Sequence, residues 1–191
     1  LIMAEKSFAI ASSKTIFQMR HLLVFLISFI GSIFFYLLGK KLFKRKWAAL
    51  TGCVFLVASP RIFAHSFYNS KDIPFMVFFI ISFYFMQIFL EKPTIKKAVM
   101  LGIVAGMLTA IRVLGILVPV LAVIFFITKS FTTKHQQHLN IKDAIATLLA
   151  LISIYTLCAI MFVPILWGNP LMSFIATLKQ MSNFPWNGTV L

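Results

Sequence analysis

Long runs of apolar residues, separated by short polar segments, dominate the sequence. The clearest runs are residues 21–39, 73–90 and 143–166. A transmembrane helix needs about 20 mostly apolar residues, so each of these runs predicts one span. A shorter run, residues 47–59, predicts a further span that extends past Pro60 toward Ala64 or lies where the bilayer is thin.

Residues 98–128 form a longer apolar stretch, in which Arg112 is the one charge in 31 positions. A single straight helix of this length would reach about 46 Å, against a hydrocarbon core of about 30 Å. Two short helices joined near residues 112–115 fit this thickness better than one tilted span. The pattern therefore predicts an all-α, polytopic transmembrane helix bundle with about six spans in residues 1–191.

The basic residues are unevenly distributed between the two sets of connecting segments. With six spans, segments 40–46, 91–97 and 129–142 lie on one side of the membrane and contain 11 of the 18 Lys and Arg residues. Cytoplasmic loops carry an excess of Lys and Arg, so we expect these segments to be cytoplasmic. Segments 1–20, 60–72 and 167–191 and the Arg112 turn then face the other side. If residues 98–128 formed one span, loop 129–142 would change sides and the asymmetry would weaken.

Composition supports a membrane location. Hydrophobic residues make up 61% of the chain, charged residues 12%, and the mean hydropathy is +0.98, whereas globular proteins average about 45–50% apolar and about 25% charged residues. The net charge of +14 would suggest nucleic-acid binding in a soluble protein. Here the bias toward basic cytoplasmic loops accounts for it, so we expect the lipid bilayer as a partner and no nucleic acid.

The chain has only four acidic residues, and Asp72 is the one whose position suggests chemistry. It ends the polar segment Asn69-Ser70-Lys71-Asp72, just before Pro74 and an apolar span. In this position it can cap free N–H groups of the following helix. An acid at the membrane edge can equally bind a metal or a polar substrate. Both interpretations stay open from the sequence.

Other polar residues on the predicted outer face are candidate substrate contacts. Arg112 sits at the interface, where its forked guanidinium suits a phosphate and its stem can also simply snorkel. Lys71, His65 and Asn69 share the outer segment with Asp72 and are predicted substrate contacts. For His65 the alternative, a histidine that does not contact the substrate, stays open. Gly102 and Gly106 form a GxxxG pattern, which favours close helix packing over a ligand site.

An ordered set of short motifs over about residues 20–120 resembles a known family. Arg20 precedes a span, Gly39-Lys40-Lys41-Leu42-Phe43 follows it, Ser59-Pro60 ends the next, and Lys71-Asp72-Ile73-Pro74 and Thr109-Ala110-Ile111-Arg112 follow in order. This series resembles the GT-C fold glycosyltransferases, in particular the dolichyl-phosphate-mannose protein mannosyltransferases (glycosyltransferase family 39) and their bacterial relatives.

The resemblance implies a membrane enzyme that transfers a sugar from a polyprenyl-phosphate donor to a lipid, glycan or protein acceptor on the non-cytoplasmic face. It implies that Asp72 matches the family's second acid, which helps to hold the donor phosphate, often with a divalent metal ion. Arg112 matches a basic residue near the carrier phosphate. We expect the membrane to be a bacterial inner membrane, with the active side facing the periplasm or exterior.

The resemblance also implies that residues 1–191 are part of a longer transmembrane domain. The chain starts at Leu1 and stops within a pattern, so we expect further spans on both sides. In the family a general base lies in the first external loop, and Glu5 lacks the acidic pair that marks it. The catalytic base is therefore expected upstream of Leu1, and residues 1–191 alone are expected to be inactive.

Two other functions remain compatible with the sequence. A transporter or flippase for a lipid-linked or small polar solute would use the same polar interface, although such proteins tend to show internal repeats. A non-catalytic membrane subunit would use Asp72 and Arg112 only to cap and anchor helices.

Overall fold

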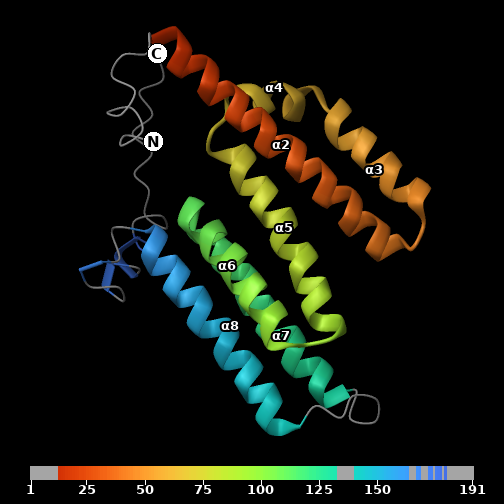
Figure 1. Ribbon diagram of the computed structural model, residues 1–191, viewed down its shortest axis with the longest axis vertical. Helices are drawn as coiled ribbons and strands as arrows, with labels where there is room; N and C mark the ends of the chain where they lie inside the picture. The colour runs from red at the N-terminus through yellow and green to blue at the C-terminus, as the bar shows by residue number, and fades with distance from the viewer. Residues whose placement is uncertain are drawn as a thin grey trace. The chain divides into compact units, whose positions relative to one another are not determined.

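The computed structural model describes residues 13–132 and 140–163, residues 167–168, and residues 172–173, 175–177 and 179. Every regular element in these ranges is helical, which confirms the predicted all-α class. The chain divides into two compact units, Leu1–Lys92 and Pro93–Leu191. The first unit contains α2 (Ser13–Phe43), α3 (Lys46–Ala58), α4 (Pro60–Tyr68) and α5 (Asp72–Glu91), and the second contains α6 (Ile95–Ile111), the 3-10 turn η1 (Val113–Ile116), α7 (Leu117–Thr132) and α8 (Ile141–Phe162) (Figure 1).

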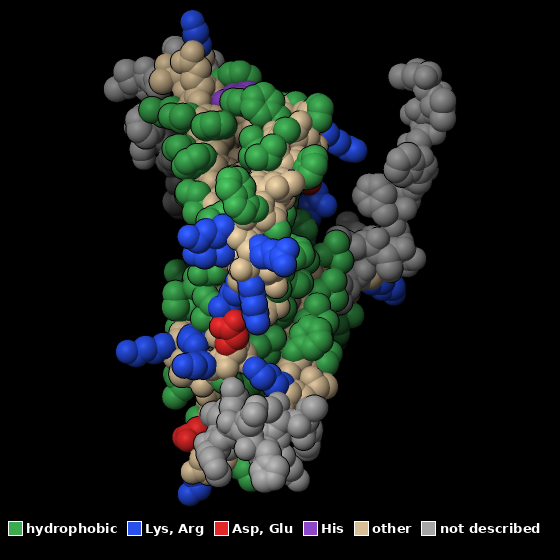
Figure 2. All heavy atoms as spheres, turned by 90° about the vertical axis from the view of Figure 1, so that its right-hand side faces the viewer, with side chains coloured by type: hydrophobic (Ala, Val, Ile, Leu, Met, Phe, Trp, Pro, Cys, Tyr) green, Lys and Arg blue, Asp and Glu red, His purple; other side chains and the backbone are tan. Residues whose placement is uncertain are grey.

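Three helices in the described ranges are long and apolar enough to cross a membrane: Lys14–Phe43, Asp72–Glu91 and Ile141–Phe162. They coincide with the three clearest apolar runs of the sequence. The first of these helices is the least covered by protein, since only 11% of its most apolar window is buried. Hydrophobic side chains cover much of the face shown in Figure 2. Because water does not tolerate so much exposed apolar surface, lipid is the environment that suits these helices.

The helices α3 and α4 form a bent pair, and together they count as a fourth candidate span. Their axes differ by 65°, and the bend lies at Ser59, whose backbone is extended. Pro60 follows at the first position of α4, and proline disfavours a helical conformation of the residue before it. The span predicted to continue past Pro60 is thus broken there. Within the predicted outer segment 60–72, residues Pro60–Tyr68 are helical.

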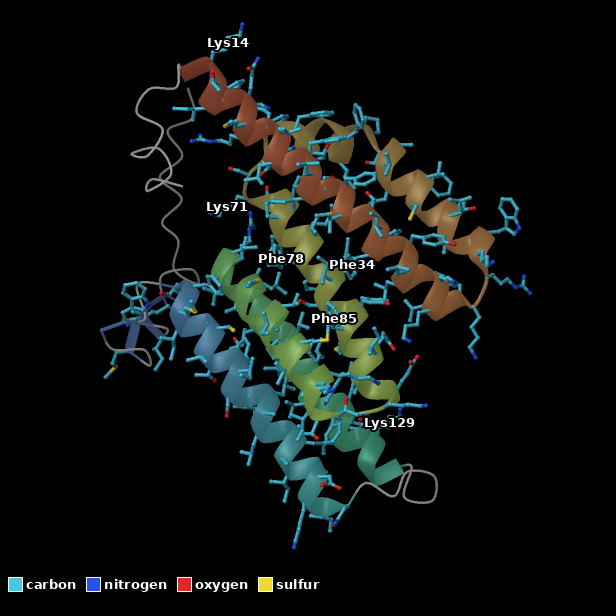
Figure 3. All side chains as sticks on the ribbon, viewed as in Figure 1. Lys14, Phe34, Lys71, Phe78, Phe85 and Lys129 are labelled. Carbon is cyan, nitrogen blue, oxygen red and sulfur yellow. The ribbon has the colours of Figure 1, made fainter. Side chains whose placement is uncertain are left out.

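In the first unit, α2 and α5 pack side by side and run in the same direction (Figure 1). Near their starts, Val24 contributes to a buried cluster with Ile73 and Val77. Further along, the rings of Phe34 and Phe85 lie 6.2 Å apart (Figure 3), and at the far end Lys41 pairs with Glu91. Contacts that advance in step along both helices place both of their starts at one end of the unit.

The ion pair at the far end bears on the orientation in the membrane. Lys41 Nζ lies 2.6 Å from Glu91 Oε2, which joins segment 40–46 to segment 91–97. The charge distribution of the sequence predicts that both segments are cytoplasmic. The contact places Lys41 and Glu91 at the same end of the unit and leaves the starts of α2 and α5 at the opposite end. Which end is cytoplasmic stays a prediction.

In the second unit, α6 and α8 pack closely through the GxxxG glycines. A Cβ at Gly102 would lie 3.1 Å from the carbonyl oxygen of Leu151, and a Cβ at Gly106 would lie 2.5 Å from the Cβ of Cys158. Since small residues allow two membrane helices to approach closely, these contacts confirm the predicted packing role. The contacts advance in the same direction along both helices, so α6 and α8 are parallel.

Residues 98–128 form two helices, as the sequence predicted. The first, α6, ends at Ile111, Arg112 is extended, and η1 leads into α7, which returns antiparallel to α6 (Figure 1). The helices are 17 and 16 residues long, near the lower limit of about 17 residues for a span. The count of six spans therefore stays a prediction for α6 and α7.

We predict that Gly106→Ala destabilises the second unit. The added methyl group would meet the Cβ of Cys158, and overpacking of this kind typically costs about 1–3 kcal/mol. The melting temperature of the purified protein in detergent should fall by several degrees. The matched control is Gly168→Ala, where no atom lies within 4 Å of the new Cβ. Equal melting temperatures for both variants would contradict the tight α6–α8 contact.

Candidate functional site

The junction between α4 and α5 is built around the side chain of Asn69. Its Oδ1 accepts hydrogen bonds from the backbone N–H groups of Asp72 (2.9 Å) and Lys71 (3.2 Å). The first N–H groups of a helix have no partner within it, so this oxygen satisfies the N–H of Asp72, the first residue of α5, and that of Lys71, the N-cap residue before it. The turn is tight because Asn69 also ends α4, where its own N–H donates to the carbonyl of His65 at 2.9 Å.

The amide nitrogen of Asn69 links two of the predicted site residues. Asn69 Nδ2 donates to Asp72 Oδ2 at 3.0 Å and lies 2.7 Å from His65 Nδ1. His65 is one helical turn before Asn69, so both side chains lie on the same face of α4. The His65 ring also contacts the Tyr68 ring, with centroids 5.1 Å apart. The structure thus brings His65, Asn69 and Asp72 together.

Exposure differs among the residues of this junction. The Asp72 and Lys71 side chains are exposed, whereas His65 and Asn69 are half-buried. Lys71 is the N-cap residue that precedes α5, and Figure 3 shows its side chain at the start of this helix. A carboxylate and an ammonium group are therefore accessible at the end of the unit opposite the Lys41–Glu91 pair, where a polar head group could reach them.

The structure shows a contact at the start of α5 that the sequence did not predict. Asp72 is the first residue of α5, and its backbone N–H donates to the side-chain oxygen of Asn69. The capping role considered for the Asp72 side chain stays a prediction. Asn69 was predicted only as a substrate contact. Asn is among the residues preferred at helix starts, and its place three residues before Asp72 is the signal that would have identified this role.

The second candidate residue, Arg112, lies at the break between α6 and η1. Its φ and ψ of −147° and 135° are extended, its N–H donates to the carbonyl of Leu108, and its own carbonyl accepts from Gly115 N–H at 2.8 Å. A Cβ at Gly115 would lie 2.6 Å from the backbone nitrogen of Thr109. Only glycine lets the turn fold back this closely on α6 and hold Arg112, which is half-buried, at the helix end.

A hydroxyl pair lies one turn before Arg112. Thr109 Oγ1 donates to the carbonyl of Ala105 at 2.9 Å and lies 3.3 Å from the hydroxyl of Tyr155 on α8. Because the single hydrogen of Thr109 Oγ1 is already used, Tyr155 is the donor in the second contact. This bond ties the last turn of α6 to α8, next to the residue that carries the positive charge.

The described residues do not assemble a complete metal centre. No group of three or more His, Cys, Asp and Glu side chains occurs among them. At the junction, Asp72 offers one carboxylate, and the Nδ1 atom of His65 is engaged with Asn69. Among the described residues, the junction therefore offers a divalent cation one carboxylate ligand, and a metal ion at Asp72 stays a prediction.

Some predicted features fall on parts of the chain outside the described residues. Glu5, which lacks the acidic pair that marks the family's general base, is one of them. Residues 133–139 of loop 129–142 lie there too, while Lys129 is in the last turn of α7 and Lys142 is the second residue of α8.

Together these features define an integral membrane protein of apolar helices, with an acidic and a basic residue at two separate helix breaks. The model of the dolichyl-phosphate-mannose-protein mannosyltransferase family matches residues 3–167. The chain therefore belongs to this family of membrane glycosyltransferases, as its motifs suggested. A search of curated proteins gave no match, and neither did a search of solved structures.

We predict that the α4–α5 junction faces the non-cytoplasmic side. In a background with Cys53→Ser and Cys158→Ala, a single Ser70→Cys should react with a membrane-impermeant thiol reagent applied from outside intact cells. A single Lys44→Cys should react only after the membrane is permeabilised. Both substitutions are at exposed positions, so a difference in labelling reports the side of the membrane on which each cysteine lies. The reverse labelling pattern would invert the proposed orientation.

Proposed function

We propose that this protein transfers a sugar from a polyprenyl-phosphate donor to an acceptor on the non-cytoplasmic face of the membrane. The observation that carries the proposal is the family match over residues 3–167. The family's name specifies dolichyl-phosphate-mannose as donor and protein as acceptor. For this chain we propose the wider classes, a polyprenyl-phosphate sugar and a lipid, glycan or protein acceptor.

Arg112 is the group proposed to bind the donor phosphate. A guanidinium presents a planar fork of N–H donors that matches phosphate oxygens. Its half-buried place at a helix break supports this role, because the attraction between charges grows as water is excluded. The apolar helices on either side of the break suit the hydrocarbon tail of the same molecule.

Asp72 has a different proposed task, because a carboxylate repels a phosphate. It can accept hydrogen bonds from hydroxyl groups of the donor sugar, or bind the phosphate through a bridging cation. Lys71, exposed beside it, offers the positive charge that such a head group needs. The general base that activates the acceptor remains a prediction for a residue outside the described ranges, and the bacterial inner membrane remains the proposed location.

We predict that Arg112→Ala lowers sugar transfer about 100-fold, the usual effect of removing one donor to a charged group. Arg112→Lys should retain part of the activity, because it keeps the charge and loses the fork. The measurement is the transfer of radiolabelled sugar from a synthetic polyprenyl-phosphate donor in membranes prepared from cells that express the full reading frame. Arg61→Ala is the control, since Arg61 is an exposed arginine of α4. Wild-type rates for both Arg112 variants would exclude phosphate binding at this residue.

We also predict that Asp72→Asn lowers transfer about 100-fold in the same assay, because the amide cannot replace the charge of the carboxylate. Asp143→Asn, at an exposed acid in the first turn of α8, should leave transfer unchanged. An excess of EDTA separates the two modes of Asp72: a loss of wild-type activity that Mg²⁺ or Mn²⁺ restores indicates a bridging cation, and no loss indicates contact with hydroxyl groups. Full transfer by Asp72→Asn would exclude a role of this carboxylate in the reaction, whereas an absence of transfer by the wild-type protein would favour a transporter or a non-catalytic subunit.

A further inference from the structure

We propose that Asn69 is a positioning residue, whose single carboxamide both caps α5 and fixes the orientation of the Asp72 carboxylate and the tautomer of His65. The consequence for sugar transfer rests on the function proposed above. The geometric part, in which one side chain sets the state of two others, is independent of it.

The surroundings of the Asn69 carboxamide determine which of its two terminal atoms is the oxygen. Oδ1 accepts from two backbone N–H groups, those of Lys71 and Asp72. Backbone N–H groups only donate, so an NH₂ group in the place of Oδ1 would face two donors. The orientation of the Asn69 amide, which otherwise has to be inferred from its surroundings, is thereby determined. Nδ2 must point to the other side.

The nitrogen of the Asn69 carboxamide determines which ring nitrogen of His65 carries the hydrogen. Nδ2 has two hydrogens and lies near two acceptors, Asp72 Oδ2 at 3.0 Å and His65 Nδ1 at 2.7 Å. Because NH₂ cannot accept, His65 Nδ1 must present a lone pair, and the hydrogen of the neutral ring is on Nε2. A doubly protonated ring would point an N–H at Asn69 and break this contact.

The hydrogen bond from Asn69 also restricts the orientation of the Asp72 carboxylate. This carboxylate is exposed at the first position of a helix, where several rotamers are open to an aspartate side chain. The Asn69 bond to Oδ2 selects a subset of these rotamers and thereby sets the direction in which the carboxylate faces a sugar or a cation. Small errors of position at a reacting centre can cost about 100-fold in rate, so this bond should matter for turnover.

Substitutions at position 69 can separate positioning from capping. Asn69→Asp and Asn69→Ser keep an oxygen that can cap α5 and lack the NH₂ donor, whereas Asn69→Ala lacks both. We expect Asn69→Asp and Asn69→Ser to keep a near wild-type melting temperature and to lose about 100-fold in transfer rate. Asn69→Ala should lose both stability and transfer. Asn140→Asp, which adds the same charge at the exposed N-cap of α8, should change neither.

A double-mutant cycle tests the connection to Asp72. If Asn69 acts through this carboxylate, Asn69→Ser should cause little further loss in an Asp72→Asn background, because groups that act as a unit are not additive. Losses that multiply would show that Asn69 acts by another route. Wild-type transfer by both Asn69→Asp and Asn69→Ser would overturn the positioning role and leave a helix cap.

A second measurement does not depend on transferase activity. In protein labelled with 15N-histidine, the signal of His65, assigned by its loss in His65→Gln, should be that of an unprotonated, hydrogen-bonded Nδ1. In Asn69→Asp the carboxylate accepts instead of donating, so Nδ1 should become protonated. A protonated Nδ1 in the neutral wild-type ring would overturn the proposal. If the wild-type protein transfers no sugar, only the proposed function fails, because the NMR result still decides the role of Asn69.

Discussion

The bilayer allows polar backbone groups only where they are hydrogen-bonded within the protein, and the structure depends on this constraint. Inside a helix every N–H and C=O group is satisfied by its own segment. Where a helix ends, its first N–H groups and last C=O groups need other partners. Both candidate sites of this chain lie at such ends. Asn69 provides the partners at the start of α5, and the Arg112–Gly115 hydrogen bond closes the turn after α6.

The same constraint explains why a residue near the membrane can combine a structural and a chemical role. At the α4–α5 junction the cap of the helix is also the neighbour of the exposed carboxylate, so the position of Asp72 follows from the way the helix begins. At the second break, Gly115 folds the chain back on α6, and this brings Arg112 to the end of the helix. In both places the chemistry would depend on how the backbone turns.

The sequence predicts the parts of this structure that follow from periodicity and length. The apolar runs became α2, α5 and α8, the length of residues 98–128 predicted a break near Arg112, and the Gly102–Gly106 spacing predicted close packing. The bend at Ser59 and the helix α4 were not predicted, because the aromatic and polar residues after Pro60 have no clear membrane pattern. The contacts of Asn69 with both His65 and Asp72 needed three-dimensional knowledge as well, since residues 65, 69 and 72 meet only when α4 ends as tightly as it does.

The central claim is that Arg112, at the break after α6, binds the phosphate of a polyprenyl-phosphate sugar. Photocrosslinking tests it most directly, with a polyprenyl-phosphate sugar that carries a photoreactive group near the phosphate and with the attachment sites mapped by mass spectrometry. The account predicts labelled peptides that contain the α4–α5 junction or the turn at Arg112, and competition by unlabelled donor. Labelling confined to segments 40–46 and 91–97, or labelling that unlabelled donor does not reduce, would contradict it.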